Sequence, residues 1–387
     1  MISAPKRFVR NLCVTAAAAA VAAGTVTGAY ALADPQEAPP APGGQTAGSV
    51  FANRTIDPDR LVSGASSGQQ YSYWSEGSDE RLHLTTAVLL EPKGATPSAG
   101  WPVVVWAHGS DGWNESCSPS RNNGGDADDR TAMNRLLKRG YAVIAPDYAA
   151  VGAPGAPQYS DVDATAHNLV DAVRAAADIG QASLSPKWAV VGQAQGAAAA
   201  ISLARNATAW QTGKLDFRGA TATSVPGGYD DVVAGLSPSS SSVPTAVVAD
   251  VLYTLASQDP AALEPILTKR GAALVEKAKT LCTAALIDEI GNTQLAGLVS
   301  RPLSSNAALA GTLRKSLTLP TRGFSRPVLM SQRLIDDTVV VPNSLRYLTE
   351  AQLTSNKVKM STYLTGDVSD AKRQEQAVVD SFLDDLY

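Results

Sequence analysis

Histidine is scarce in this chain of 387 residues, which contains only three: His83, His108 and His167. None of them lies near Cys117 or Cys282 in the sequence, so the spacing does not predict a zinc site of the Cys/His type. The sequence contains no other pattern that predicts a metal ion or an organic cofactor. We therefore expect neither.

An excess of positive charge is also lacking. The chain has 32 Lys and Arg residues against 36 Asp and Glu residues, which gives a formal net charge of −4. Proteins that bind nucleic acid or anionic lipid through charge usually present a basic face. The composition excludes nucleic acid as a predicted partner and names no protein partner.

Long apolar runs are missing except near the N-terminus. Lys6, Arg7 and Arg10 form a basic start, an Ala/Val/Gly-rich run follows to about residue 29, and residues 31–33 read Ala-Leu-Ala. This pattern predicts a signal peptide over residues 1–33 and an exported, extracytoplasmic protein. A membrane anchor is the alternative, but the run is short, weakly apolar and followed at once by a cleavage pattern. Cleavage would remove three positive charges and leave a net charge of −7.

Cysteine is nearly absent as well. After signal cleavage only Cys117 and Cys282 remain. Two cysteines in an oxidising compartment predict one disulfide. The alternative is a pair of buried free thiols.

The rest of the chain divides by composition. Residues 34–48 are rich in Pro and Gly and predict an extended linker. We expect an α/β core over residues 49–225, a helical insertion over residues 226–315 that starts near a Pro-Gly-Gly and a Ser-rich stretch, and the end of the core over residues 316–387.

The core shows apolar runs alternating with segments of helical spacing. This alternation predicts a mostly parallel central sheet flanked by helices. The expected strands cover residues 83–90, 102–107, 141–145, 188–191, 327–331 and 359–364; the expected helices cover residues 131–139, 161–179, 195–204, 343–353 and 370–386; and the longest helix of the insertion covers about residues 260–290.

The most informative stretch is residues 190–199, Val-Val-Gly-Gln-Ala-Gln-Gly-Ala-Ala-Ala. Gly192 and Gly196 occupy the outer positions of a G-x-S-x-G nucleophile elbow, and Ala194 stands where the serine would be. Such an elbow needs small residues because its central residue is held in a strained conformation on a sharp strand-to-helix turn. The setting between an apolar strand and an Ala-rich helix makes the pattern specific.

Other motifs occur in the order that this elbow predicts. Residues 106–109 read Trp-Ala-His-Gly after an apolar strand, residues 146–148 read Pro-Asp-Tyr after the next, and residues 336–342 form an acidic turn that ends in proline. From about residue 80 to its end, the chain resembles the secretory lipase and esterase branch of the α/β-hydrolase family. The resemblance implies the α/β-hydrolase fold, with the insertion as a cap over an acyl site.

The resemblance also implies site positions. Ala194 stands at the nucleophile position, and Gln195 would supply one N–H of an oxyanion hole. The second N–H would come from Gly109 or Ser110. Asp336 resembles the acid of the triad, with its neighbour Asp337 as the alternative.

Two departures from the family pattern decide the expected chemistry. A methyl group at position 194 neither attacks a carbonyl nor carries an acyl group. In this family the histidine follows the acid, at or just after Asp367, yet every histidine of the chain precedes Ala194. Val368 marks the approximate position of the missing imidazole. Loss of the nucleophile alone lowers turnover about 10⁶-fold in comparable enzymes.

The remaining polar residues have simpler interpretations. His108 is expected to position the oxyanion loop and not to act as a base. Asp336 with Asp337 is better interpreted as a former triad acid beside a turn residue than as a carboxylate pair for acid–base work or a metal. Ser110 and Ser369 lack a nearby histidine that would activate them.

Three functional hypotheses follow. The first is a secreted pseudohydrolase that has lost ester cleavage and binds an acyl or other apolar ligand. The second is an active carboxylic-ester hydrolase with unconventional residues, such as water activated near Asp336. The third is an active lipase in which position 194 was changed to Ala by design, although one such change would have left the histidine in place.

Overall fold

A computed structural model describes residues 44–121, 125–148, 161–180, 183–364 and 367–387. The predicted signal peptide and most of the predicted linker lie outside these residues. The described end of the linker forms a turn, in which the Gly48 amide donates a hydrogen bond to the Trp74 carbonyl at 2.7 Å.

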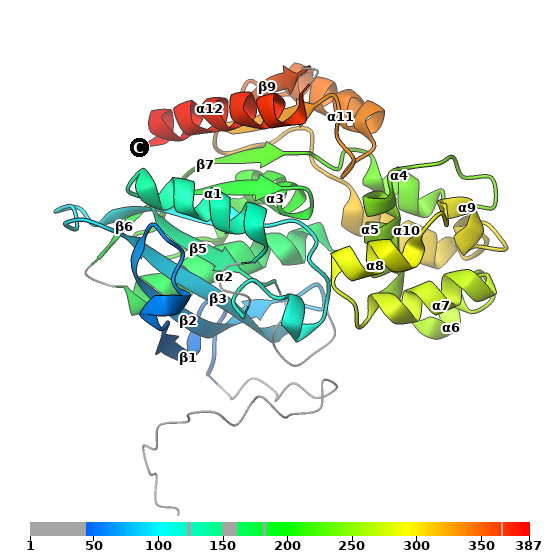
Figure 1. The fold of residues 1–387 in the computed structure, drawn as a ribbon, viewed down its shortest axis with the longest axis horizontal. Helices are drawn as coiled ribbons and strands as arrows, with labels where there is room; N and C mark the ends of the chain where they lie inside the picture. Colours follow the sequence, from blue (N-terminus) through cyan, green and yellow to red (C-terminus); the bar gives the residue numbers. More distant parts are fainter. Residues whose placement is uncertain (1–43, 122–124, 149–160, 181–182, 365–366) are drawn as a thin grey trace, which may run out of the picture. The chain divides into compact units, whose positions relative to one another are not determined.

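A nine-stranded sheet forms the centre of the molecule (Figure 1), in the order β1-β2-β3-β5-β4-β6-β7-β8-β9. The pairs β1–β2, β2–β3 and β3–β5 are antiparallel, and the strands from β5 to β9 are parallel. The strands are β1 Val50–Thr55, β2 Ala65–Glu76, β3 Leu82–Pro92, β4 Trp101–Ala107, β5 Ala142–Pro146, β6 Leu184–Gln193, β7 Asp216–Thr223, β8 Val328–Arg333 and β9 Val358–Tyr363. The mostly parallel sheet agrees with the predicted fold class.

Helices cover both faces of the sheet, which explains why β4 and β5 are almost entirely apolar. One face packs against α2 (Val162–Ile179), α3 (Gln195–Trp210) and α11 (Val341–Thr354). The other face packs against α1 (Ala127–Lys138) and α12 (Val368–Leu386). The carboxyl ends of the parallel strands therefore meet at one edge between two helical layers.

The insertion between β7 and β8 is helical and has its own apolar core. It gathers at one side of the sheet in Figure 1 and is called the cap below. Its helices are α4 Tyr229–Ala234, α5 Thr245–Ala256, α6 Pro260–Leu263, α7 Lys269–Ala278, α8 Thr283–Ile290, α9 Leu295–Leu298 and α10 Ala307–Leu317.

The prediction of one helix over residues 260–290 is wrong, because three short helices occupy this range. The first helix, α6, ends at Leu263, and Pro265 has no N–H with which to continue its hydrogen-bond ladder. Thr268 then begins α7 by accepting a hydrogen bond from the Gly271 amide at 2.9 Å. A second break precedes α8, whose N-cap residue is Cys282.

Three strands were not predicted from the sequence. β1 and β2 form the antiparallel edge, and β2 exposes or half-buries many polar residues, so it has no apolar run. β7 reads Asp-Phe-Arg-Gly-Ala-Thr-Ala-Thr, and its pairing with β6 and β8 holds it in the sheet. Tertiary pairing overrides weak local preference here.

A disulfide joins the core to the cap. Cys117 ends the short 3-10 helix η3 (Glu115–Cys117) in the loop after β4, and it is bonded to Cys282 at the start of α8 with a Cα–Cα distance of 5.4 Å. The predicted disulfide is thus present. Among the described helices, none is both long enough and apolar enough to span a bilayer.

Candidate functional site

Ala194 occupies the turn between β6 and α3 in a backbone conformation that few non-glycine residues adopt. Its φ is 49° and its ψ is −113°. The Ala194 amide donates a hydrogen bond to the Thr223 carbonyl at 3.1 Å, which ties the turn to β7. Holding a residue in such a region costs about 1–3 kcal/mol and is common at functional sites.

The two glycines around Ala194 are required by close backbone contacts. A Cβ atom on Gly192 would lie 2.3 Å from the Gly196 carbonyl oxygen, and one on Gly196 would lie 1.9 Å from the Ala107 carbonyl oxygen. The Gly196 amide also donates a hydrogen bond to the His108 carbonyl at 3.1 Å. No side chain fits at either position without moving the backbone of β4 or α3.

The loop after β4 lies against this turn. A Cβ atom on Gly109 would lie 3.7 Å from the Cβ of Ala194, and the Ser110 hydroxyl donates a long hydrogen bond, 3.4 Å, to the side-chain oxygen of Gln195. The structure thus brings together Ala194, Gln195, Gly109 and Ser110, the residues that the resemblance assigned to a nucleophile position and an oxyanion hole.

His108 is buried beneath this loop with both ring nitrogens facing oxygen atoms. Nδ1 lies 2.7 Å from the Gly109 carbonyl and 3.1 Å from an Asp111 carboxylate oxygen, and Nε2 lies 3.0 Å from the Pro146 carbonyl. The imidazole stacks on the ring of Tyr148 at 4.5 Å. A ring with acceptors at both nitrogens favours the doubly protonated, charged form.

Several carboxylates determine the protonation of His108. Burial lowers the pKa of His108, but the hydrogen bond and charge of Asp111, with the charges of Asp129 and Asp147, outweigh it and raise this pKa to about 9. Burial raises the pKa of Asp147 to about 6. A charged imidazolium is not a general base, which supports the positioning role predicted for His108.

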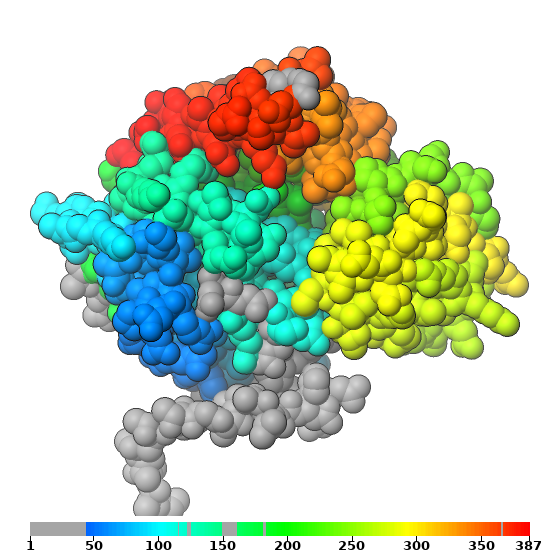
Figure 2. Space-filling model, in the orientation of Figure 1, coloured from blue at the N-terminus to red at the C-terminus, as the bar shows by residue number. Residues whose placement is uncertain are grey.

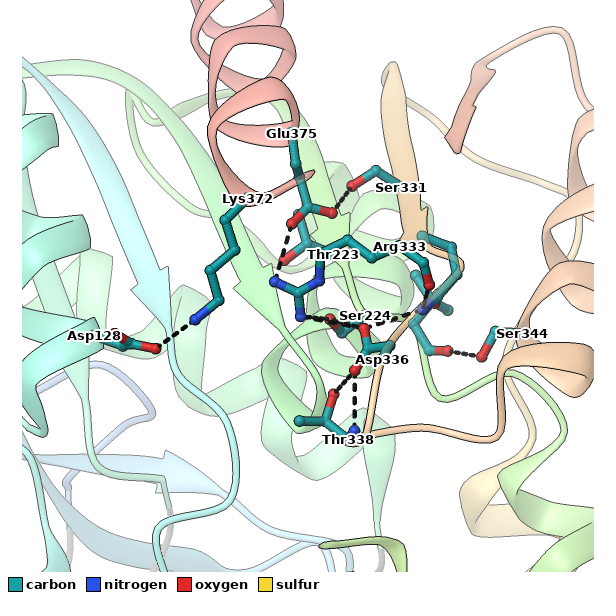
Figure 3. A network of polar contacts seen from close by, with 12 residues as sticks. Asp128, Thr223, Ser224, Ser331, Arg333, Asp336, Thr338, Ser344, Lys372 and Glu375 are labelled. Carbon is teal, nitrogen blue, oxygen red and sulfur yellow. Dashed lines mark hydrogen bonds and ion pairs between the residues drawn. The ribbon is translucent and has the colours of Figure 1, made fainter. Parts of the chain in front are cut away.

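Asp336 lies at the turn after β8 (Figure 3). Its side chain is fully buried, whereas Asp337 beside it is exposed. One carboxylate oxygen accepts hydrogen bonds from Ser224 at 2.7 Å, Gln332 at 3.1 Å and Arg333 at 3.2 Å. The other accepts from the Thr338 amide at 3.0 Å and the Thr338 hydroxyl at 2.6 Å. Five donors thus surround the carboxylate.

These donors determine the charge of Asp336. Burial raises its pKa, but the hydrogen bonds from Thr338 and Ser224 and the charge of Arg333 outweigh burial, so that the pKa of Asp336 lies below its usual value. A carboxylate with a lowered pKa is a weak base and a poor activator of water.

Arg333 is a residue that the sequence analysis missed. Its buried guanidinium lies 3.2 Å from Asp336 and 3.7 Å from the Glu375 carboxylate of α12, which accepts a further hydrogen bond from Ser331 at 2.7 Å. Figure 3 shows Arg333 between the two carboxylates. The signal in the sequence was an arginine at the end of an apolar strand, because a buried arginine requires a partner.

Val368 begins α12 and is 47% exposed. β9 leads toward it beside β8, where the Leu334 amide donates a hydrogen bond to the Tyr363 carbonyl at 2.8 Å. Residues 365–366 of the connecting loop lie outside the described residues. Asp367 accepts a hydrogen bond from the Ser369 amide at 2.8 Å and so caps α12.

A cavity of about 50 Å³ opens at Ala194 between the core and the cap. Its apolar side chains include Val162, Leu317 and Val339, its hydroxyl groups include Thr165 and Tyr229, and its two acids are Asp161 and Asp250. None of the described lining residues is basic. Pockets for drug-sized ligands measure about 300–1,000 Å³, so the cap or the side chains must move before a larger ligand enters.

The cap is fastened to the loop that forms one wall of this cavity. Besides the disulfide, two hydrogen bonds from Thr283 reach this loop. The Thr283 amide donates to the Asp111 carbonyl at 3.1 Å, and the Thr283 hydroxyl donates to the Ser110 carbonyl at 2.5 Å. Figure 2 shows the cap, in yellow and yellow-green, directly against the cyan segment that contains this loop. Cap and loop are therefore one connected wall.

Comparisons with solved structures identify the fold. Candida antarctica lipase A in its closed state superposes with a TM-score of 0.68 at 17% identity, over 83% of this chain and 78% of that one. The rice cell wall degrading esterase LipA from Xanthomonas oryzae superposes with a TM-score of 0.70 at 19% identity, over 88% of this chain and 98% of that one. No protein-family model and no curated protein sequence matches the chain. The chain thus has the α/β-hydrolase fold of lipases and esterases.

Proposed function

We propose that this chain is an exported protein of the α/β-hydrolase fold that does not cleave esters through an acyl-enzyme and that binds a small ligand in the cavity at Ala194. The observation that carries the proposal is the position of Ala194, at the strained turn between β6 and α3 and against Gly109, with a methyl group where a nucleophile would stand. A methyl group forms no covalent intermediate.

The surroundings of Asp336 support the same proposal. In a working triad the acid orients an imidazole through a hydrogen bond. Here the carboxylate already accepts hydrogen bonds from Ser224, Gln332, Arg333 and Thr338. This carboxylate therefore serves an internal network, and its lowered pKa argues against the alternative in which it activates water.

The lining of the cavity favours a neutral, partly apolar ligand. Apolar residues contribute about half of the lining, among them Val162 of α2, Ala198 of α3 and Leu317 at the end of α10. Asp161 and Asp250 add negative charge. Like charges repel, so a free fatty-acid anion is a poor match, whereas an ester, an alcohol or an amide is not repelled.

Export is part of the proposal. It is supported by the signal-peptide pattern of residues 1–33 and by the Cys117–Cys282 disulfide, since structural disulfides persist in oxidising compartments. Expression with the native N-terminus and N-terminal sequencing of the recovered protein would test it, with cleavage after Ala33 as the expected result.

Labelling with a fluorophosphonate probe tests the loss of catalysis. We expect the purified mature protein to show no labelling and no turnover of p-nitrophenyl butyrate at micromolar protein. Labelling of any of its side chains, or acyl transfer to one, would refute the proposal.

A restoration experiment provides the matched control. Ala194→Ser alone is expected to remain inactive, because no imidazole is available to take the serine proton. Ala194→Ser combined with Val368→His and Arg333→Met supplies the imidazole and removes one competing partner of Asp336. We expect this variant to gain labelling at residue 194, whereas Val368→His with Arg333→Met on Ala194 gains none.

Extraction of the purified protein tests ligand binding. Mass spectrometry of the extract is expected to find a neutral apolar compound, at a lower yield in Val339→Asp, which adds a third acid to the cavity wall. An equal yield from both proteins would contradict binding at this cavity.

A further inference from the structure

A second cavity lies at the antiparallel edge of the sheet and shares no lining residue with the cavity at Ala194. It measures about 230 Å³ and is lined by β1, the short 3-10 helix η2 (Pro58–Arg60), β2, β3 and the loop that contains Ser120. In Figure 2 the blue segment that holds β1 and η2 lies on the opposite side of the view from the yellow cap.

Two arginines line this cavity. Arg54 donates two hydrogen bonds to the side-chain oxygen of Gln70, one from Nε at 2.8 Å and one from a terminal nitrogen at 2.5 Å. Among the described residues, Arg54 donates to no carboxylate, so its charge faces a neutral acceptor. Arg60 donates to the Arg121 backbone carbonyl at 3.2 Å, which brings a third arginine to the same rim.

The rim carries net positive charge. Asp57 is the only acid among the described lining residues, against Arg54 and Arg60. Burial lowers the pKa of Arg121, and the positive charge of Arg54 lowers it further, against the opposing effect of Asp147. Two guanidinium groups against one carboxylate among the described lining residues favour an anion in this cavity.

The floor of the cavity is apolar and closely packed. The floor consists of the side chains of Val62, Val88 and Leu90, each of which is at most 6% exposed. The Ser120 hydroxyl lies beside them and accepts a hydrogen bond from the Gln70 amide at 3.2 Å. A ligand that fits must combine an anionic group for the rim with a small apolar body for the floor.

From this combination we propose that the cavity is a binding site for a small organic oxyanion, with Arg54 and Arg60 holding the anionic group and the apolar floor holding a body of about one ring. Guanidinium groups pair with the oxygens of carboxylates and phosphates through two parallel hydrogen bonds. The volume is below that of drug-sized pockets, which limits the ligand to a single small body.

Titration calorimetry on the full mature protein tests the site with three probes that share one ring: benzoate, phenyl phosphate and neutral benzyl alcohol. We expect at least one of the two anions to bind, with an affinity that falls as salt rises, and benzyl alcohol to bind at least 10-fold more weakly. Tighter binding of benzoate or of phenyl phosphate tells which oxyanion the rim prefers.

Variants locate the binding. Arg54→Met and Arg60→Met keep length and apolar contact but remove the charge, and each is expected to weaken anion binding about 10-fold or more, because hydrogen bonds to charged groups contribute strongly. Arg301→Met, at an exposed site in the cap, is the matched control and should bind as the parent does. Absence of anion binding at millimolar concentration, or unchanged binding in both Arg54→Met and Arg60→Met, overturns the proposal. The result is independent of the cavity at Ala194.

Discussion

Ala194 has the strained backbone of a nucleophile elbow, although its side chain is a methyl group. Glycine at this position would adopt φ 49° without steric conflict, at the cost of a more flexible unfolded chain. We expect Ala194→Gly to raise the free energy of unfolding by about 1 kcal/mol, because relief of strain of about 1–3 kcal/mol exceeds that cost. Urea unfolding followed by circular dichroism would measure the change.

The control for this substitution is Ala377→Gly, at an exposed position inside α12. Glycine in a helix interior is about 1 kcal/mol less favourable than alanine. The two substitutions should therefore change stability in opposite directions, and a loss of similar size in both would show that Ala194 is not strained.

A second prediction at the scale of one residue concerns the pH dependence of the stability that His108 contributes. Its pKa of about 9 in the folded protein exceeds the unfolded value, so the folded state binds an extra proton between these values. The stabilisation is complete below pH ~6.5 and is lost as the pH rises through about 9, with a total of roughly 3 kcal/mol. Urea unfolding at pH 7 and pH 9.5 should show a larger loss in the parent than in His108→Gln. Parallel losses would contradict a charged imidazole.

At the scale of elements, the predictable parts are those whose local pattern agrees with their packing. The strand β4, the turn at Ala194 and the helix α3 were predicted because apolar runs and close-packed glycines directly reflect burial. β7 was missed because its neighbours, and not its composition, hold it in the sheet. In the cap, breaks at Pro265 and before Cys282 interrupt an otherwise helical pattern.

The candidate site divides in the same way. The positions of Ala194 and Asp336 follow from order along the chain, since each comes directly after a strand of the parallel sheet. Gln332, Arg333 and Thr338 are also close to Asp336 in the sequence. Ser224 follows β7 and Glu375 lies in α12, however, and only folding brings these two residues to Arg333. Sequence separation hides such a network.

At the same scale, we predict how much the network between β8 and α12 contributes to stability. Arg333→Met leaves the carboxylates of Asp336 and Glu375 buried without their cation, and removing one partner of a buried ion pair costs about 3–5 kcal/mol. We expect a loss of this order in urea unfolding at pH 7, partly recovered by adding Glu375→Gln. Arg314→Met breaks an ion pair with Asp231 whose side chains are about half exposed, and it should cost less than about 1 kcal/mol. Equal effects would show that the buried network contributes no more than a surface pair.

At the scale of the whole molecule, the core has an apolar cluster on each face of the sheet and the cap has a third. Chain connections, hydrogen bonds and one covalent bond join the cap to the core. The Cys117–Cys282 bond closes a loop with a sequence separation of 165 residues. In the chain-entropy model such a loop stabilises the folded state by about 5 kcal/mol, and measured losses are typically 2–5 kcal/mol. The same bond holds the cap against the wall of the cavity at Ala194.

Replacing both cysteines with alanine therefore has two expected consequences. The free energy of unfolding in urea should fall by about 2–5 kcal/mol, and limited proteolysis should cut the segments between α6 and α8 faster, because the cap loses its covalent link to the loop after β4. Dithiothreitol should bring the parent protein to the same stability and leave the double variant unchanged. If reductant weakens both proteins equally, its effect does not come from this disulfide. If the double variant is as stable as the parent, the two hydrogen bonds from Thr283 and the packing around them are sufficient to hold the cap.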